Sequence, residues 1–198
     1  LTMISLYLGK RKYLSSEAVA NYLRELERVP DHIERILEQS DHIRDCTQRY
    51  IDRENWLFLG RGYNYPIAME GALKLKEISY IHAESYAAGE LKHGPLALVD
   101  AEMPVFAVAP NNTLLEKLIS NIEEVSARGG ELYVIADTNV VSNFQQRHGR
   151  VIGLDTGGPL LAPVIMTIPL QLLAYHVAVQ RGTDVDQPRN LAKSVTVE

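Results

Sequence analysis

Hydrophobic positions at helical spacing dominate the first 53 residues. Three segments show this spacing, at about 15–29, 30–39 and 40–53, and Ser40 is the expected N-cap of the last one. In the first segment the apolar positions that share a face are Val19, Tyr22, Leu23 and Leu26. We therefore expect an N-terminal segment made only of helices.

From Asn55 onward, short apolar runs alternate with longer amphipathic stretches. Four runs predict buried strands: NWLFLG, PVFAVAP, ELYVIAD and RVIGL. The first leads through the glycine-rich turn GRGYN into a helix, the second into another helix, and the fourth into a long apolar helix from near Leu160. The segment TNVVSNFQQRHG after the third run is predicted to be a polar loop. This order predicts an α/β fold, with a mostly parallel sheet flanked by helices on both faces.

Composition excludes several classes of protein. Of 198 residues, 46% are hydrophobic and 23% are charged, which is typical of a globular chain with a full core. The formal net charge of -5 gives no electrostatic reason to expect a nucleic-acid partner. The single cysteine, Cys46, cannot form an internal disulfide and fits a reducing, cytoplasmic compartment.

The most apolar stretch, residues 159–179, is predicted to be a buried helix and not a membrane span. Polar and helix-interrupting residues break it, namely Pro163, Pro169, Gln171 and His176. The chain begins at Leu1, inside an apolar segment that has no N-cap. We therefore expect a fragment of a longer protein.

One helix carries an unusual set of charges. At 100° per residue, Glu70, Lys74 and Glu77 fall within about 60° of one another, between two apolar borders. They could form an ordinary solvated ion pair, or a polar island facing a pocket, where a carboxylate and an amine serve proton transfer. The residues alone leave both interpretations open.

Two further positions could carry chemistry. His93, in AGELKHGP, lies at a helix end or in a loop and is either a surface histidine or an acid or base available near neutral pH. The tail DQPRNLAKSVTVE retains apolar residues to bury, at Leu191, Val195 and Val197. A docked tail would desolvate Lys193, lower its pKa and make a neutral, nucleophilic amine available, whereas a frayed tail would leave an ordinary lysine.

The sequence contains no spacing of residues typical of a metal site and no GxSxG nucleophile motif. The glycine-rich GRGYN is predicted to be a tight turn.

The run EGALKLKEISYIHAESYAAGELKHGPLALVD and the tail DQPRNLAKSVTVE together resemble the glucosamine-6-phosphate synthase family, the glutamine:fructose-6-phosphate amidotransferases. The isomerase half of that family is built from two sugar isomerase (SIS) subdomains. The resemblance implies that residues 54–185 form the second subdomain, that 1–53 are linker helices and the end of the first, and that 186–198 are a tail with the active-site lysine. It also implies that a glutaminase domain and the first subdomain are missing from this chain.

The resemblance further implies an activity and a role for each matched residue. The family converts fructose 6-phosphate and glutamine-derived ammonia to glucosamine 6-phosphate for amino-sugar (UDP-N-acetylglucosamine) biosynthesis, as a homodimer and without a metal or cofactor. Lys193 matches the lysine that forms a Schiff base at C2, and Glu77 the carboxylate that moves a proton between C1 and C2. His93 matches the histidine that opens the sugar ring and reaches the site of the neighbouring subunit. Glu70 and Lys74 match residues that support ring opening and the geometry of proton transfer. Ala192 matches a position whose backbone carbonyl faces the sugar.

Two other functions remain as alternatives. A simple aldose-ketose phosphate isomerase would need a carboxylate base but no Schiff-base lysine. A non-catalytic SIS module that only binds a phosphosugar would need neither. Because the phosphate-binding loops belong to the missing subdomain, we expect this chain alone to be inactive.

Overall fold

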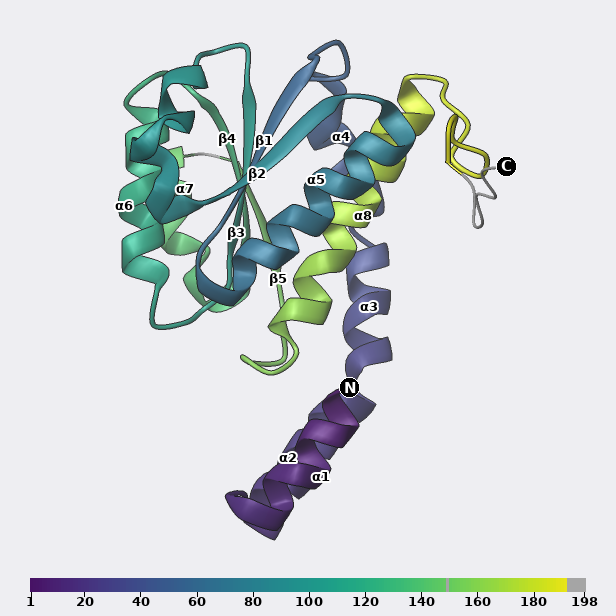
Figure 1. The fold of residues 1–198 in the computed structure, drawn as a ribbon, viewed down its shortest axis with the longest axis vertical. Helices are drawn as coiled ribbons and strands as arrows, with labels where there is room; N and C mark the ends of the chain where they lie inside the picture. The colour runs from purple at the N-terminus through teal and green to yellow at the C-terminus, as the bar shows by residue number, and fades with distance from the viewer. Residues whose placement is uncertain (149, 192–198) are drawn as a thin grey trace, which may run out of the picture.

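The fold is built on a five-stranded parallel sheet (Figure 1). A computed structural model describes residues 1–148 and 150–191, with side chains from 146 to 148 left out. Across the sheet the strand order is β2-β1-β3-β4-β5, and every neighbouring pair is parallel. The strands are β1 (Asn55–Gly60), β2 (His82–Ala87), β3 (Pro104–Ala109), β4 (Glu131–Asp137) and β5 (Val151–Leu154). The predicted α/β class is confirmed.

Helices cover both faces of this sheet, as predicted. One layer contains α5 (Tyr65–Ser79) and α8 (Ala162–Gln180), which pack against each other, with α3 (Val29–Leu37) and α4 (Ser40–Gln48) against α8. The other layer contains α6 (Leu115–Ser126) and α7 (Ser142–His148). Short 3₁₀ turns complete the chain: η1 (Gly62–Asn64), η2 (Ala88–His93), η3 (Pro95–Leu98) and η4 (Thr138–Val140).

The strand sequences explain why two layers are needed. In β1, Trp56 and Phe58 face the α5 and α8 layer, whereas Leu57 and Leu59 face the α6 layer, and all four are nearly or fully buried. Trp56 stacks on Phe106 of β3 with the ring centroids 5.1 Å apart. A strand that is apolar on both sides is stable only when helices cover both faces.

The N-terminal helices divide into two groups. The hairpin of α1 (Thr2–Lys12) and α2 (Ser16–Glu27) extends away from the sheet (Figure 1), and Ser15 caps α2 by accepting the Ala18 N–H at 3.1 Å. Helices α3 and α4 instead belong to the body of the molecule. The expected all-helical start is confirmed, but not all of it stands apart from the sheet.

Three details of the predicted elements were wrong. The edge strand β2 was not predicted, because its sequence HAESYA has too few apolar positions to give a strand pattern. The expected polar loop at 138–149 contains η4 and α7, since Phe144 is buried and fixes this segment on the sheet. Ser40 is not an N-cap, because α4 begins at Ser40 itself and Gln39 occupies the cap position; the Ser40 hydroxyl is hydrogen bonded to His176 Nε2 at 2.8 Å instead.

The long apolar helix α8 is a packing element of the core. Its length and composition would suffice to cross a membrane, but half of its most apolar window is buried inside the molecule. Its buried residues include Ile165, Leu170 and Leu173, which join the core beneath α5. The prediction of a buried helix is confirmed in this respect.

Candidate functional site

Helix α5 presents the three charged residues as one connected strip. Lys74 Nζ lies 2.8 Å from Glu77 Oε2 and 3.7 Å from Glu70 Oε1. About a third of each side chain is exposed, so the strip is neither buried nor freely solvated. The hydrogen bond that Lys74 donates to Glu77, together with the charges of both carboxylates, raises the pKa of Lys74. Lys74 is therefore an ammonium at neutral pH, and it fixes the position of the Glu77 carboxylate.

The opposite face of α5 determines where this strip points. Ile67, Gly71 and Leu75 are buried against the sheet and α8. Gly71 permits a close approach, because a Cβ there would lie 3.0 Å from Leu170 Cδ1 of α8. With this face packed, the positions at Glu70 and Glu77 can only face outward.

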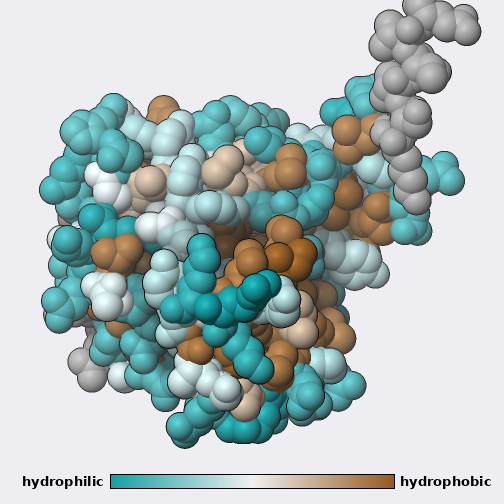
Figure 2. Space-filling model, turned by 60° about the horizontal axis from the view of Figure 1, so that its bottom comes forward, coloured by the Kyte–Doolittle hydropathy of each residue, from teal (hydrophilic) through white to brown (hydrophobic). Residues whose placement is uncertain are grey.

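Two hollows lie along the strip, one at each end. A groove of about 470 Å³ between the first turns of α5 and α8 includes Glu70, with Tyr63, Pro163 and Gln171 around it. Figure 2 shows the molecule with the bottom of Figure 1 turned toward the viewer. Hydrophobic surface gathers near the middle of this face. Exposed apolar side chains on the two helices include Met69, Leu73 and Val164.

The second hollow joins the strip to the C-terminal tail. It measures about 310 Å³ and is lined by Glu77 and its neighbours on α5 together with Arg189, Asn190 and Leu191. The Leu191 side chain is 52% exposed, so the expectation that it is buried was wrong, because the hollow that it lines is open on one side. Lys193 and Ala192, with Val195 and Val197, lie outside the described residues.

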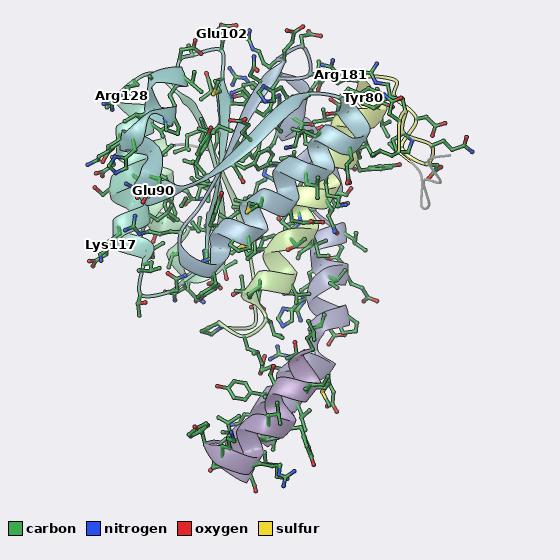
Figure 3. The ribbon with its side chains drawn as sticks, in the orientation of Figure 1. Tyr80, Glu90, Glu102, Lys117, Arg128 and Arg181 are labelled. Carbon is green, nitrogen blue, oxygen red and sulfur yellow. The ribbon has the colours of Figure 1, made fainter. Side chains whose placement is uncertain are left out.

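His93 lies in a different part of the molecule from the strip. It is the last residue of η2, its side chain is 74% exposed, and its Nε2 is 3.8 Å from Glu90 Oε2. The buried residues of η2, Ala88 and Leu91, pack into the α6 layer, on the other side of the sheet from α5. Figure 3 shows Glu90 on the α6 side of the molecule. The structure thus brings together Glu70, Lys74 and Glu77, but not His93.

The turn after β1 holds its two glycines for different reasons. Gly62 has a φ of 60°, a backbone conformation that favours glycine. Gly60 is required by a close approach instead, since a Cβ there would lie 2.2 Å from the Asn64 carbonyl oxygen. The Arg61 guanidinium beside them donates to Asn121 Oδ1 at 2.8 Å, a contact across two elements that the sequence did not reveal. The prediction of a tight turn at GRGYN is confirmed.

Other chemistries find little support in the described part of the chain. Burial raises the pKa of the Cys46 thiol, which disfavours a thiolate nucleophile. Among residues 1–148 and 150–191, no group of three histidine, cysteine or acidic residues is placed to hold a metal ion.

Sequence reasoning missed two residues that connect the tail to α5. The Tyr80 hydroxyl accepts the backbone N–H of Arg189 at 2.9 Å, and the Arg189 guanidinium lies 4.1 Å from the centre of the Tyr80 ring. These residues are 109 positions apart in the chain. No local pattern marks either one, so only the tertiary structure could pair them.

Comparison with known proteins follows the same residues. A profile of the SIS domain matches residues 49–181. A glutamine--fructose-6-phosphate aminotransferase [isomerizing] from Legionella pneumophila (strain Lens) is 61% identical over 176 residues, which are 89% of this chain and 29% of that protein. The enzyme of the same name from Escherichia coli (strain K12) is 57% identical over 198 residues, or 100% of this chain and 32% of its own length.

The fold agrees with a solved structure from the same group of proteins. The C-terminal domain of glucosamine-fructose-6-phosphate aminotransferase from Francisella tularensis superposes with a TM-score of 0.91 and 49% sequence identity. The match covers 94% of this chain and 52% of that one. This chain spans about a third of the length of the curated relatives that it matches.

Proposed function

Because this chain belongs to the SIS domain family and matches the C-terminal SIS region of the isomerizing aminotransferases, we propose that it supplies the second isomerase subdomain of such an enzyme. The observation that carries this proposal is the identity of 57% across all 198 residues, a span that includes both the charged strip and the tail. The enzyme would convert fructose 6-phosphate and ammonia from glutamine to glucosamine 6-phosphate, in the cytoplasm, for amino-sugar biosynthesis.

The proposal assigns a part to each region of the chain. Residues 1–53 are the linker helices and the end of a preceding SIS subdomain, residues 54–185 the second subdomain, and residues 186–198 the tail with the active-site lysine. On this proposal, the rest of the full-length protein would provide the glutaminase domain and the first subdomain, whose loops would bind the sugar phosphate.

The chemistry begins at Lys193. Its neutral amine adds to the C2 carbonyl of the open-chain ketose, and loss of water gives a protonated imine. The positive charge makes the hydrogens on C1 more acidic. Ammonia then replaces the lysine amine at C2, and the Glu77 carboxylate takes a proton from C1 to give an enolamine. Return of that proton to C2, with loss of the proton on the C1 hydroxyl, gives an aldehyde at C1 and an amine at C2. No atom beyond those of ketose and ammonia is consumed, and water is the other product.

The strip fits these steps in its charge and position. Glu77 lines the same hollow as the base of the tail, so a base and the chain leading to the nucleophile meet in one place. Lys74 donates to Glu77 and thereby orients the carboxylate, and Glu70 lies at the other side of the same ammonium. Glu70 and Lys74 would support ring opening and the geometry of proton transfer, and the Ala192 carbonyl would face the sugar.

His93 would act across a dimer interface. Within one chain it lies on the α6 layer, away from the strip on α5. Its exposed imidazole is free to reach the sugar bound by a neighbouring subunit, where it would open the ring. A symmetric dimer would give each of its two sites one such histidine.

Borohydride trapping tests the proposal directly. The full-length protein and the isolated chain are incubated with fructose 6-phosphate, reduced with borohydride, and digested for peptide mass analysis. We expect a sugar adduct on Lys193 in the full-length protein and little or none in the isolated chain, because the phosphate-binding loops are expected in the preceding subdomain.

Two results would favour the alternatives. Isomerisation by the full-length protein without an adduct on Lys193 would indicate an aldose-ketose isomerase that uses only a carboxylate base. Binding of the sugar phosphate with neither turnover nor adduct would indicate a non-catalytic phosphosugar-binding module.

A further inference from the structure

The end of helix α5 is held in a costly backbone conformation. Tyr80 has φ 61° and ψ 16°, in the left-handed region, and its N–H closes the last turn by donating to the Lys76 carbonyl at 3.3 Å. Where a helix ends in this conformation, the residue is usually glycine and sometimes asparagine, which adopt it at lower cost. A tyrosine here must offset the strain by contacts that those residues cannot make.

Those contacts are with the tail. The Tyr80 ring lies beneath the Arg189 guanidinium, 4.1 Å from ring centre to the central carbon, and the Tyr80 hydroxyl accepts the Arg189 N–H at 2.9 Å. Figure 3 shows Tyr80 at the end of α5, beside the segment that leaves α8. The Tyr80 side chain therefore contacts both the guanidinium and the backbone N–H of Arg189.

The segment between α8 and Arg189 is also fixed to α5 and to itself. Thr183 Oγ1 donates to the Ile78 carbonyl at 2.6 Å. The Asp184 carboxylate accepts the N–H groups of Asp186 and Gln187 at 2.9 and 3.0 Å, which makes a tight turn. These hydrogen bonds hold the backbone between α8 and Arg189 in one conformation, which brings Arg189 to Tyr80.

Beyond Tyr80 the chain turns into the hollow that contains Glu77. Asn190 has φ 61°, a conformation that asparagine tolerates, and it redirects the backbone. Residues 189–191 then line the hollow of about 310 Å³ with Glu77 and Leu73. Lys193 follows Leu191 by two positions, a span of at most about 7 Å of backbone.

We propose that Tyr80 is a positioning residue of the aminotransferase reaction, which fixes the point where the tail leaves the body so that the Lys193 amine and the Glu77 carboxylate act on the same sugar. This inference rests on the proposed function. Tyr80 touches no reacting atom. It acts through Arg189, by limiting the volume that the following residues can sample before the amine adds to C2.

The proposal predicts a separation of binding from chemistry. The sugar phosphate is expected to be bound by the preceding subdomain, so loss of the anchor should leave KM for fructose 6-phosphate nearly unchanged. The rate at which Lys193 forms its adduct and kcat should fall together, because an unanchored tail spends less time with its amine near C2.

The test uses four variants of the full-length protein, measured by the rate of borohydride-trapped adduct on Lys193 and by kcat and KM. Tyr80→Asn removes the ring but suits the left-handed backbone, and we expect an adduct rate lower by about tenfold. Tyr80→Phe keeps the ring and loses only the hydroxyl, so we expect a decrease of about threefold. Arg189→Gln removes the guanidinium, and Tyr80→Asn/Arg189→Gln removes both partners.

The double variant distinguishes a specific anchor from general damage. If the two side chains act as one contact, Tyr80→Asn/Arg189→Gln will be no slower than Tyr80→Asn alone. Tyr175→Gln is the matched control, since it removes a partly exposed tyrosine ring of the neighbouring α8, which meets the His176 ring edge to face. This control should leave the adduct rate within about twofold of the wild type.

Each failure has a separate meaning. Unchanged adduct rates in Tyr80→Asn and Arg189→Gln, with a normal adduct in the wild type, would overturn the anchor while leaving the proposed function intact. Absence of an adduct in a wild-type enzyme that still turns over would overturn the role of Lys193 itself. If Tyr80→Asn does not fold, Arg189→Gln carries the test, because it changes only an exposed side chain.

Discussion

At the scale of residues, the strip on α5 derives its chemistry from one ammonium between two carboxylates. Lys74 pairs with Glu77 at 2.8 Å and with Glu70 at 3.7 Å, and its raised pKa keeps it charged. On an ordinary solvated helix such pairs contribute only a few tenths of a kcal/mol to stability. The greater consequence here is positional, because the shorter contact fixes the carboxylate that we propose moves the proton.

Glu77→Gln tests the role of this carboxylate. The amide preserves the size of the side chain and can still accept a hydrogen bond from Lys74, but it cannot take a proton. We expect kcat of the full-length enzyme to fall by about 10² to 10⁴-fold, with KM changed little and with trapping on Lys193 retained. Glu124→Gln on α6, which breaks an ion pair with Lys92, should leave kcat unchanged. Loss of trapping in Glu77→Gln would assign Glu77 to an earlier step.

A second residue-scale prediction concerns the turn before α5. Gly60→Ala would place a Cβ 2.2 Å from the Asn64 carbonyl oxygen. That oxygen belongs to the backbone and the Cβ is attached directly to the backbone, so the clash can be relieved only by moving the main chain. We expect the free energy of unfolding to fall by about 2 to 3 kcal/mol. In Gly62→Asn the new Cβ would meet only the end of the Leu114 side chain, and asparagine tolerates the backbone, so the loss should be smaller. Urea unfolding measured by fluorescence of the only tryptophan, Trp56, compares the two. Equal losses would contradict this account.

At the scale of elements, α8 connects the parts of the molecule. It packs against α5 through the close approach at Gly71, and against α4 through the hydrogen bond between Ser40 and His176. Burial lowers the pKa of His176, and the nearby Arg44 charge acts in the same direction. The imidazole at this junction is therefore neutral in the folded protein near pH 7.

This pKa shift predicts how stability depends on pH. Because the folded pKa of His176 lies below its unfolded value of about 6.5, the unfolded chain binds more protons between the two values. The stabilisation is complete above pH 6.5 and is lost as the pH falls through the folded pKa. We expect the free energy of unfolding to decrease from pH 7.5 to 5.5, and to decrease less in His176→Gln. An identical slope in the variant would assign the pH dependence to other groups.

At the scale of the whole molecule, the two candidate acid-base groups lie on opposite layers. Glu77 belongs to the α5 layer and His93 to the α6 layer, with the sheet between them. If both act on one sugar, they come from different subunits. The proposed active unit is therefore larger than a single chain, and it also needs the preceding subdomain.

Hybrid dimers test this arrangement. A dimer of one Glu77→Gln subunit and one His93→Ala subunit contains one site with both groups intact and one site with neither. After random mixing of equal amounts, half of the dimers are hybrids, so we expect about a quarter of the wild-type activity. Neither variant alone should approach that value. Activity no greater than the mean of the two variants would place His93 and Glu77 in the same subunit's site.

The pattern of apolar and charged residues was enough to predict the fold class and the composition of the strip. Buried strands that are apolar on both sides require helices on both faces, and a spacing of four and three residues puts Glu70, Lys74 and Glu77 on one helical face, whatever surrounds them. The tertiary structure alone decided the rest. The edge strand β2 is set by pairing with β1 and not by its own weak pattern, and Tyr80 meets Arg189 only because α8 returns the chain to the end of α5. Local spacing controls local faces, whereas contacts between distant segments depend on how the layers pack.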